Sequence, residues 1–347
     1  MTGPGLALLA AVLFGLSAPA AKLLVGAVDP WLLAGLLYLG SGVGLGCLAL
    51  VRRLGGVATR EAGLNARDLV PLAGAIATGG VIGPVLLMFA LAHGAASESS
   101  LLLNLEGVFT ALLAAALFRE HVSLRVAMGM AAITGGATTI AWTGDGGFTI
   151  DPSALLVVGA CVAWAIDNNL TRAVSATDPV TVAALKGAVA GTVNVGIAVA
   201  LGAQWPAALV ALAAGLVGFL GYGTSLVLFV RALRQLGASR TGGYFSTAPF
   251  IGAVAGVVGL REPLTARLAM GAALMAAGVW LHLTERHDHE HAHEALTHEH
   301  AHRHDEHHQH DHPGDMTVTE PHSHSHAHES LQHHHPHYPD LHHRHGH

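Results

Sequence analysis

Ionisable and amide side chains lie inside long apolar runs of this chain. The first is Glu106, in the run Leu101 to Glu120 (LLLNLEGVFTALLAAALFRE), with Asn104 two residues before it. A carboxylate this deep in an apolar segment needs a partner, a proton or a water-filled cavity. We therefore predict a solute or proton site at Glu106. The alternative is a structural carboxylic acid, kept neutral by its surroundings and hydrogen-bonded to a neighbouring helix.

A second polar group occupies the run 153 to 174, and its members are Trp164, Asp167, Asn168, Asn169, Thr171 and Arg172. On a helix, Trp164 and Asn168 share one face, while Asp167 lies on the adjacent face. Two interpretations stay open for this group. It is either a solvated cytoplasmic mouth or part of a binding cavity.

A narrow polar stripe follows in the run 180 to 202, where Lys186, Ala190 and Asn194 recur at every fourth position. Lys186 is one of two lysines in the chain, and we predict it as the counter-ion of Asp167 or Glu106. The competing explanation is that its ammonium group snorkels to the cytoplasmic surface.

The tail after Glu285 contains all of the 27 histidines except His93, His121 and His282. It has almost no aliphatic residues, so it cannot form a core and is predicted to be disordered. Because imidazole suits Ni, Co, Zn and Cu(II), we expect a flexible chelator with several sites. The alternative is a low-complexity extension that binds no metal. The alternating candidates are His287, His289, His291, His293, His298, His300, His302, His304, His322, His324, His326 and His328.

The elements that must position these residues are membrane-spanning helices. Hydrophobic residues make up 52% of the chain and charged residues only 12%, which excludes a soluble domain for the first 285 residues. Apolar runs of about 20 residues predict ten helices. The expected limits are 5 to 26, 31 to 51, 69 to 92, 98 to 118, 123 to 142, 153 to 174, 180 to 202, 207 to 232, 240 to 260 and 265 to 284.

These runs form an internal repeat. Gly94 to Gly136 aligns without a gap on Leu236 to Gly278, so that Ala96-Ser97 and Arg119-Glu120 match Ala238-Ser239 and Arg261-Glu262. Asp29-Pro30 and Asp178-Pro179 mark matching positions earlier in each half. We expect two five-helix repeats at 1–145 and 146–286 and the tail at 287–347. An odd number of spans inverts the second repeat, which is a recurrent plan of secondary transporters.

The arginines predict the orientation. With a cytoplasmic N-terminus, the inward loops hold most of the arginines and the outward loops only Arg261 and Arg267, as the positive-inside rule requires. The first run lacks a preceding positive segment, so we expect it to be retained as a span and not cleaved as a signal peptide. Both termini are then cytoplasmic, in a multi-pass protein of the cell (inner) membrane.

Glycine and proline inside the spans have two expected uses. Pairs such as Gly42 and Gly46 are predicted to let helices pack closely. Pro19, Pro84 and Pro249 lie within spans and either break them, freeing carbonyls for a solute path, or only kink them.

The paired halves resemble the EamA-like permeases of the drug/metabolite transporter superfamily. The residues that carry this resemblance are the closings Phe118 to His121 and Leu260 to Pro263, Met128-Gly129 and Met270-Gly271, and Ala248-Pro249-Phe250. The resemblance implies a ten-helix fold with a central site between the halves. One departure is that Glu106-Gly107 stands where the second copy has Ala248-Pro249 and the family often has proline.

We therefore expect an all-α secondary transporter that exports a small polar solute by alternating access, linked to transition-metal (Ni, Co or Zn) homeostasis. Its partners are the lipid bilayer and a small-molecule or metal-ion substrate, without nucleic acid, and the sequence leaves a homodimer open. No cofactor is required beyond metal in the tail. Alternatives are an organic metabolite or drug exporter whose tail only binds metal, and a membrane-anchored metal store or sensor. An enzyme is not expected, because the sequence contains no HExxH motif, serine elbow or phosphate-binding loop.

Overall fold

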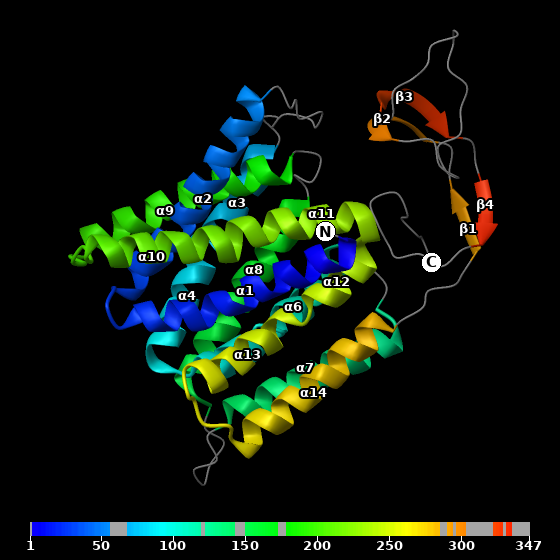
Figure 1. Cartoon of the computed structure of the whole chain (residues 1–347). Coiled ribbons are helices and arrows are strands. Elements are labelled where there is room, and N and C mark those ends of the chain that lie inside the picture. Colours follow the sequence, from blue (N-terminus) through cyan, green and yellow to red (C-terminus); the bar gives the residue numbers. More distant parts are fainter. Residues whose placement is uncertain are drawn as a thin grey trace. The chain divides into compact units, whose positions relative to one another are not determined.

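The ten predicted helical spans are present in the computed structural model, which describes residues 2–55, 68–118, 122–142, 150–172 and 178–284 and four short strands of the tail. The all-α architecture is therefore confirmed (Figure 1). Six spans are single helices, namely α1 (Gly3–Val25), α2 (Pro30–Leu54), α7 (Leu124–Ala141), α8 (Pro152–Arg172), α9 (Pro179–Ala200) and α14 (Ala266–Leu283). The other four are interrupted, and their bounds follow.

The repeated Asp-Pro pairs begin matching helices. The Asp29 carboxylate accepts a hydrogen bond from the Trp31 amide at 2.9 Å, and the Asp178 carboxylate accepts one from the Thr181 amide at 3.0 Å. Each aspartate thus caps free N–H groups at a helix N-terminus, and the following proline fits the first helical position. The same local chemistry therefore starts the second span of each repeat.

The third and eighth spans each contain a π-helical segment. The third consists of α3 (Leu69–Ala75), η2 (Ile76–Ile82) and α4 (Gly83–His93), and the eighth of α10 (Ala208–Gly218), η3 (Phe219–Thr224) and α11 (Ser225–Leu236). The alignment that places Gly94 on Leu236 also places Gly79 of η2 on Gly221 of η3. π-Helical turns are rare and are often found at functional sites. The sequence did not predict them.

The fourth and ninth spans are broken at matching positions. The fourth consists of α5 (Ala96–Leu102) and α6 (Leu105–Phe118), and the ninth of α12 (Ala238–Phe245) and α13 (Ala248–Gly259). The span predicted at 98 to 118 is present, but it is interrupted at Leu103 and Asn104, which the sequence did not predict. Polar side chains replace the missing backbone bonds, since the Asn104 amide donates to the Leu101 carbonyl at 2.9 Å and the Ser246 hydroxyl to the Gly243 carbonyl at 2.8 Å.

The prolines differ in their effect. Pro249 lies in the first turn of α13, directly after the break, and Pro84 in the first turn of α4, directly after η2. Pro19 remains inside the continuous helix α1. A break therefore accompanies Pro249 as expected, whereas the break in the fourth span has no proline.

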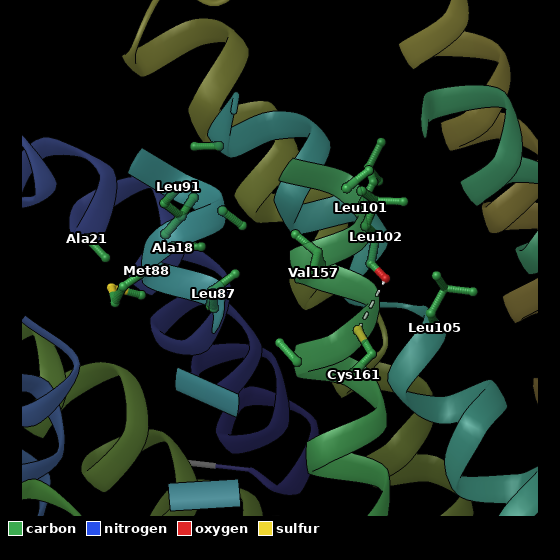
Figure 2. Close-up of a cluster of buried hydrophobic side chains, with 14 of the residues drawn as sticks. Ala18, Ala21, Leu87, Met88, Leu91, Leu101, Leu102, Leu105, Val157 and Cys161 are labelled. Carbon is green, nitrogen blue, oxygen red and sulfur yellow. Dashed lines mark hydrogen bonds between the residues drawn. The ribbon is translucent and has the colours of Figure 1, made fainter. Parts of the chain in front are cut away.

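Buried apolar side chains join the first repeat to α8. Leu87, Met88 and Leu91 of α4 lie near Ala18 and Ala21 of α1, and Figure 2 shows this group. In the same view the Cys161 thiol of α8 donates to the Leu102 carbonyl at 3.6 Å, one of the carbonyls at the end of α5. The break in the fourth span is thus held against the second repeat.

Matching spans of the two repeats pack together at glycines. The helix α2 lies along α9, and α7 lies along α14, where Figure 1 shows the two helices side by side. A Cβ on Gly42 of α2 would overlap the backbone of Gly187 and Ala188 in α9. A Cβ on Gly46 would meet no atom within 4 Å, so the packing role predicted for both glycines holds for Gly42 only.

This difference predicts opposite results for two alanine substitutions on α2. Gly42→Ala should lower the free energy of unfolding by about 1–3 kcal/mol, because the added methyl group forces α9 away. Gly46→Ala should leave stability unchanged or raise it slightly. Thermal unfolding of the two purified variants in detergent measures both effects. Equal stabilities would contradict the close α2–α9 contact.

The tail forms a unit of its own, separate from the helical unit that ends at Thr284. The sequence predicts disorder there, whereas the structure describes two antiparallel strand pairs, β1 (Glu290–His293) with β4 (Leu331–His334) and β2 (Leu296–His302) with β3 (His322–His328). The His-x-His alternation has the two-residue period of a strand, which suits such pairing. The candidates His287, His289 and His304 lie outside the described residues, as do Arg119-Glu120 and the expected repeat boundary at 145 and 146.

Candidate functional site

The predicted site residues gather around α8, between both repeats. One side of α8 packs against η2 and α4, and another packs against α6. The stripe on α9 also packs against η2. Residues of α6 and η2 from the first repeat therefore meet residues of α8 and α9 from the second.

Lys186 and Asp167 form an ion pair. The Lys186 Nζ atom lies 2.5 Å from Asp167 Oδ1, and the two side chains are 16% and 11% exposed. Thr171 donates its hydroxyl to the same carboxylate oxygen at 2.8 Å. Lys186 is thus the counter-ion of Asp167, one of its two predicted partners, and its ammonium points into the helix bundle. A charge pair removed from water in this way needs such additional hydrogen bonds.

The glycines of η2 complete this group. A Cβ on Gly79 would overlap the Asp167 carboxylate, so a glycine there makes room for the charged group. The Gly79 carbonyl oxygen accepts two hydrogen bonds, from the Trp164 indole at 2.9 Å and from the Tyr38 hydroxyl of α2 at 2.8 Å. Trp164 was predicted for the site. Tyr38 was missed, although a lone tyrosine inside the apolar run 31 to 51 is a signal that could have indicated it.

Asn194 contributes a fully buried amide. Its Nδ2 group donates to the Gly80 carbonyl of η2 at 3.1 Å. Its Oδ1 atom is buried without a hydrogen-bond partner among the described residues. Ala190, one turn earlier, lies against Gly80. The predicted stripe on α9 therefore faces η2 and offers one unused acceptor there.

Glu106 lies in the first turn of the half-helix α6, directly after the break. Its Oε1 atom accepts a hydrogen bond from the Asn168 amide at 2.8 Å, and the same amide lies 3.3 Å from the Thr110 hydroxyl. A helix N-terminus favours a negative charge. Asn168 faces α6 while its neighbour Asp167 faces η2, so α8 connects the two carboxylates through adjacent faces.

Asn104 lies in the break itself and bonds elsewhere. Its amide group donates to the Leu101 carbonyl and lies 3.8 Å from the Met275 sulfur of α14. The structure thus brings Glu106 together with Asn168, Asp167 with Lys186, and Trp164 and Asn194 with η2, while Asn104 serves the backbone of the break.

A comparison with models of protein families identifies the family of this chain. The model of the EamA-like transporter family matches residues 1–142 and 151–284. The chain belongs to the EamA-like transporter family. It is therefore a multi-pass membrane protein of a family of transporters.

Two further comparisons agree with this EamA-like transporter. An uncharacterised transporter of Methanothermobacter thermautotrophicus is 27% identical over 288 residues, which cover 78% of this chain and 83% of that protein. A crystal structure with 20% sequence identity has a TM-score of 0.59 and covers 81% of this chain and 98% of the other. At that identity the second likeness shows the fold alone.

The two repeats of this EamA-like transporter carry different residues at matching positions of the site. The alignments that match Gly94 with Leu236 and Asp29 with Asp178 place Ala248 at the position of Glu106 and Pro19 at that of Asn168. Aromatic rings gather on that side, since Tyr222 lies 5.6 Å from Tyr38 and 6.2 Å from Phe14 between ring centroids. The ionisable groups thus occupy one of the two matching places, and Tyr38 connects that place to the aromatic rings of the other.

Metal ligands do not gather among the helices. Within the part of the chain whose side chains are described, no group of three or more His, Cys, Asp and Glu side chains could hold a metal ion. The polar groups of the site are the amides of Asn168 and Asn194, the Tyr38 and Thr171 hydroxyls, the Trp164 indole, Lys186 and two carboxylates, which suit hydrogen bonding and charge pairing.

Proposed function

We propose that this EamA-like transporter is a secondary transporter that exports a small polar solute across the inner membrane by alternating access. Both termini are cytoplasmic in this proposal. The observation that carries it is that α8 connects Glu106 of the first repeat, through Asn168, with the Asp167–Lys186 pair of the second repeat, beside a π-helix and a broken helix. Charged groups within a membrane span are costly and mark solute or proton paths. Inverted repeats with discontinuous helices around a midplane site suit alternating access.

Glu106 is the group that couples transport to the proton gradient. Asp167 has Lys186 as its counter-ion, whereas the described partner of Glu106 is the neutral amide of Asn168. A charged Glu106 favours a bound solute or cation, and a protonated Glu106 favours the empty site. A difference of this kind between two states is what shifts a conformational equilibrium.

The experiment for this function begins with protein truncated after Thr284, where the helical unit ends. A thermal-shift screen of metabolites and metals selects solutes that raise its melting temperature, and proteoliposomes then measure their flux with and without an imposed pH gradient. Flux that follows the gradient supports the proposal. A stabilising solute that moves no faster than through protein-free liposomes contradicts it.

A transition-metal link is the second candidate, and the tail carries it. The register of β2 and β3 pairs His298 with His326, His300 with His324 and His302 with His322. Residues at every second position share one face of a strand, and directly opposite residues share that face of the pair. The register thus aligns six histidines in three directly opposite pairs along β2 and β3, and imidazole is a ligand that suits Ni, Co or Zn.

A substitution that keeps the composition tests this register. Three neighbour exchanges shift the β2 histidines by one position, out of register with the β3 histidines, namely Thr297→His with His298→Thr, Glu299→His with His300→Glu, and Ala301→His with His302→Ala. We expect the full-length protein to lose about tenfold or more in Ni²⁺ affinity, because each pair of opposite positions on β2 and β3 then offers one imidazole in place of two. Competition with a coloured chelator measures this affinity. Unchanged affinity would indicate a flexible chelator instead.

The remaining alternatives differ in what the tail does for the cell. Deleting residues 287–347 should change cellular Ni, Co or Zn content if the transported solute is a metal. Unchanged metal content and tolerance would favour an organic solute with a tail that only binds metal. A metal store or sensor would bind metal through the tail while the helical unit moves no solute.

A further inference from the structure

Glu262 joins the two repeats at one end of the bundle. Its two carboxylate oxygens accept hydrogen bonds from consecutive backbone amides at the start of α5, from Ala96 at 2.7 Å and from Ser97 at 2.8 Å. Ala96 and Ser97 are 0% and 1% exposed. Glu262 follows α13 in the second repeat, whereas α5 belongs to the first. A carboxylate that binds free N–H groups in this way makes strong, charge-assisted hydrogen bonds.

The backbone before Glu262 is strained in a way that places it there. Arg261 has a φ of 58°, which makes it the one non-glycine residue with positive φ in the described part of the chain. Such a conformation costs free energy and persists only where the surrounding structure supports it. The Glu262 amide is also bonded, to the Gly256 carbonyl at 3.3 Å. The turn after α13 therefore directs the Glu262 carboxylate at α5.

Next to this carboxylate, α13 and α5 are in close contact, but one buried hydroxyl group at their interface has no hydrogen-bond partner among the described residues. A Cβ on Gly256 of α13 would lie 2.7 Å from the Ser97 nitrogen and 2.8 Å from Glu262 Oε2. One turn further into the bundle, Gly252 approaches Ser100, whose hydroxyl is buried without a hydrogen-bond partner among the described residues. A buried hydroxyl without a partner costs free energy, and opening the contact to water would satisfy it.

The segment that Glu262 holds is a short half-helix. The break at Leu103 and Asn104 separates α5 from α6, the half-helix that carries Glu106. Breaks and element ends are the usual hinges of conformational changes. The Glu262 bonds tie the start of α5, the end opposite to this break, to the turn after α13.

We propose that Glu262 is a latch that closes the end of the transporter at which α5 begins, the outer end in the expected orientation. When the latch is made, α5 packs on α13 and the site around Glu106 and Asp167 has no path along this interface. When it releases, the α5 half-helix separates from α13 and opens that path. This role is distinct from solute binding, and it concerns the motion between the two access states.

Cysteine labelling tests the latch directly. Ser100→Cys, in a background with Cys47→Ala and Cys161→Ala, reports on the α5–α13 interface, and the melting temperature of each variant reports on global stability. With protein in nanodiscs, Glu262→Gln should raise the rate of maleimide labelling at position 100 by about tenfold or more, because one of the two acceptors becomes a donor. The melting temperature should change little.

Two pairs of variants make the result specific. Glu98→Gln removes a charge from α5 itself and should leave labelling at position 100 within about twofold of the native rate. Gly256→Ala should raise the rate as Glu262→Gln does, whereas Gly259→Ala, on the same helix with no neighbour within 4 Å, should not. Native labelling rates in both Glu262→Gln and Gly256→Ala would overturn the proposal, as would faster labelling that appears only together with a large loss of melting temperature in both variants. None of these outcomes depends on the solute or on proton coupling.

Discussion

Glu106→Gln should abolish flux driven by a pH gradient in proteoliposomes, a loss of about 100-fold or more. Glutamine keeps the size of the side chain and an oxygen that accepts the hydrogen bond from Asn168, so the local structure is retained. It cannot release or take up a proton, and the two access states then no longer differ in protonation at this position. Flux of the solute selected by thermal shift, with and without the gradient, measures the effect.

Glu98→Gln is the matched control for this prediction, since it changes the same residue type in the same span, on the other side of the break. It should keep gradient-driven flux. Full gradient-driven flux in Glu106→Gln would remove this carboxylate from the mechanism and leave the structural interpretation, in which the bond from Asn168 only ties α6 to α8. Equal melting temperatures of the two variants would show that a lost flux is not a lost fold.

Lys186→Met should lower the free energy of unfolding by about 3 kcal/mol. The substitution leaves the Asp167 carboxylate, whose side chain is 11% exposed, without its cation. Removing one partner of a buried pair is far more costly than removing both, because the remaining charge has lost water and receives no compensation. Chemical unfolding of the purified protein in detergent measures the change. The exposed Arg231→Met on α11 should change stability by less than about 0.5 kcal/mol.

The double variant Asp167→Asn with Lys186→Met separates stability from transport. With both charges removed, it should regain most of the stability that Lys186→Met loses. Solute flux should remain low, because the pair supplies the charges that a polar solute would contact. A single Lys186→Met variant as stable as the native protein would show that the pair is well hydrated. A double variant with native flux would place the solute elsewhere.

The Arg-Glu motif illustrates how sequence and structure complement each other. The repeat alignment identified Arg261-Glu262 and Ala96-Ser97 as matching features of the two halves, without a reason for either. The structure shows that the acid of one half binds the backbone of the other half at the matched serine. The two observations are therefore parts of one contact between the repeats.

Much of the architecture followed from the sequence. The ten spans depend on hydropathy over about 20 residues, a signal that is local and strong because lipid excludes unpaired backbone groups and charged side chains. The inverted repeat followed from the gapless alignment and from the odd number of spans in each half. The polar residues within apolar runs were also visible in the sequence, since a charge within an apolar run is rare enough to be conspicuous.

The tertiary structure alone decided how these residues pair and where helices depart from regular geometry. Lys186 had two candidate partners, and only the packing of α8, α9 and η2 assigns it to Asp167 and leaves Glu106 to Asn168. The break at Asn104 and the π-helix at Gly79 depend on bonds from distant residues, Cys161, Trp164 and Tyr38, to backbone carbonyls. Hydropathy depends on residue type along the chain, whereas these bonds depend on which side chains of other helices reach a given carbonyl.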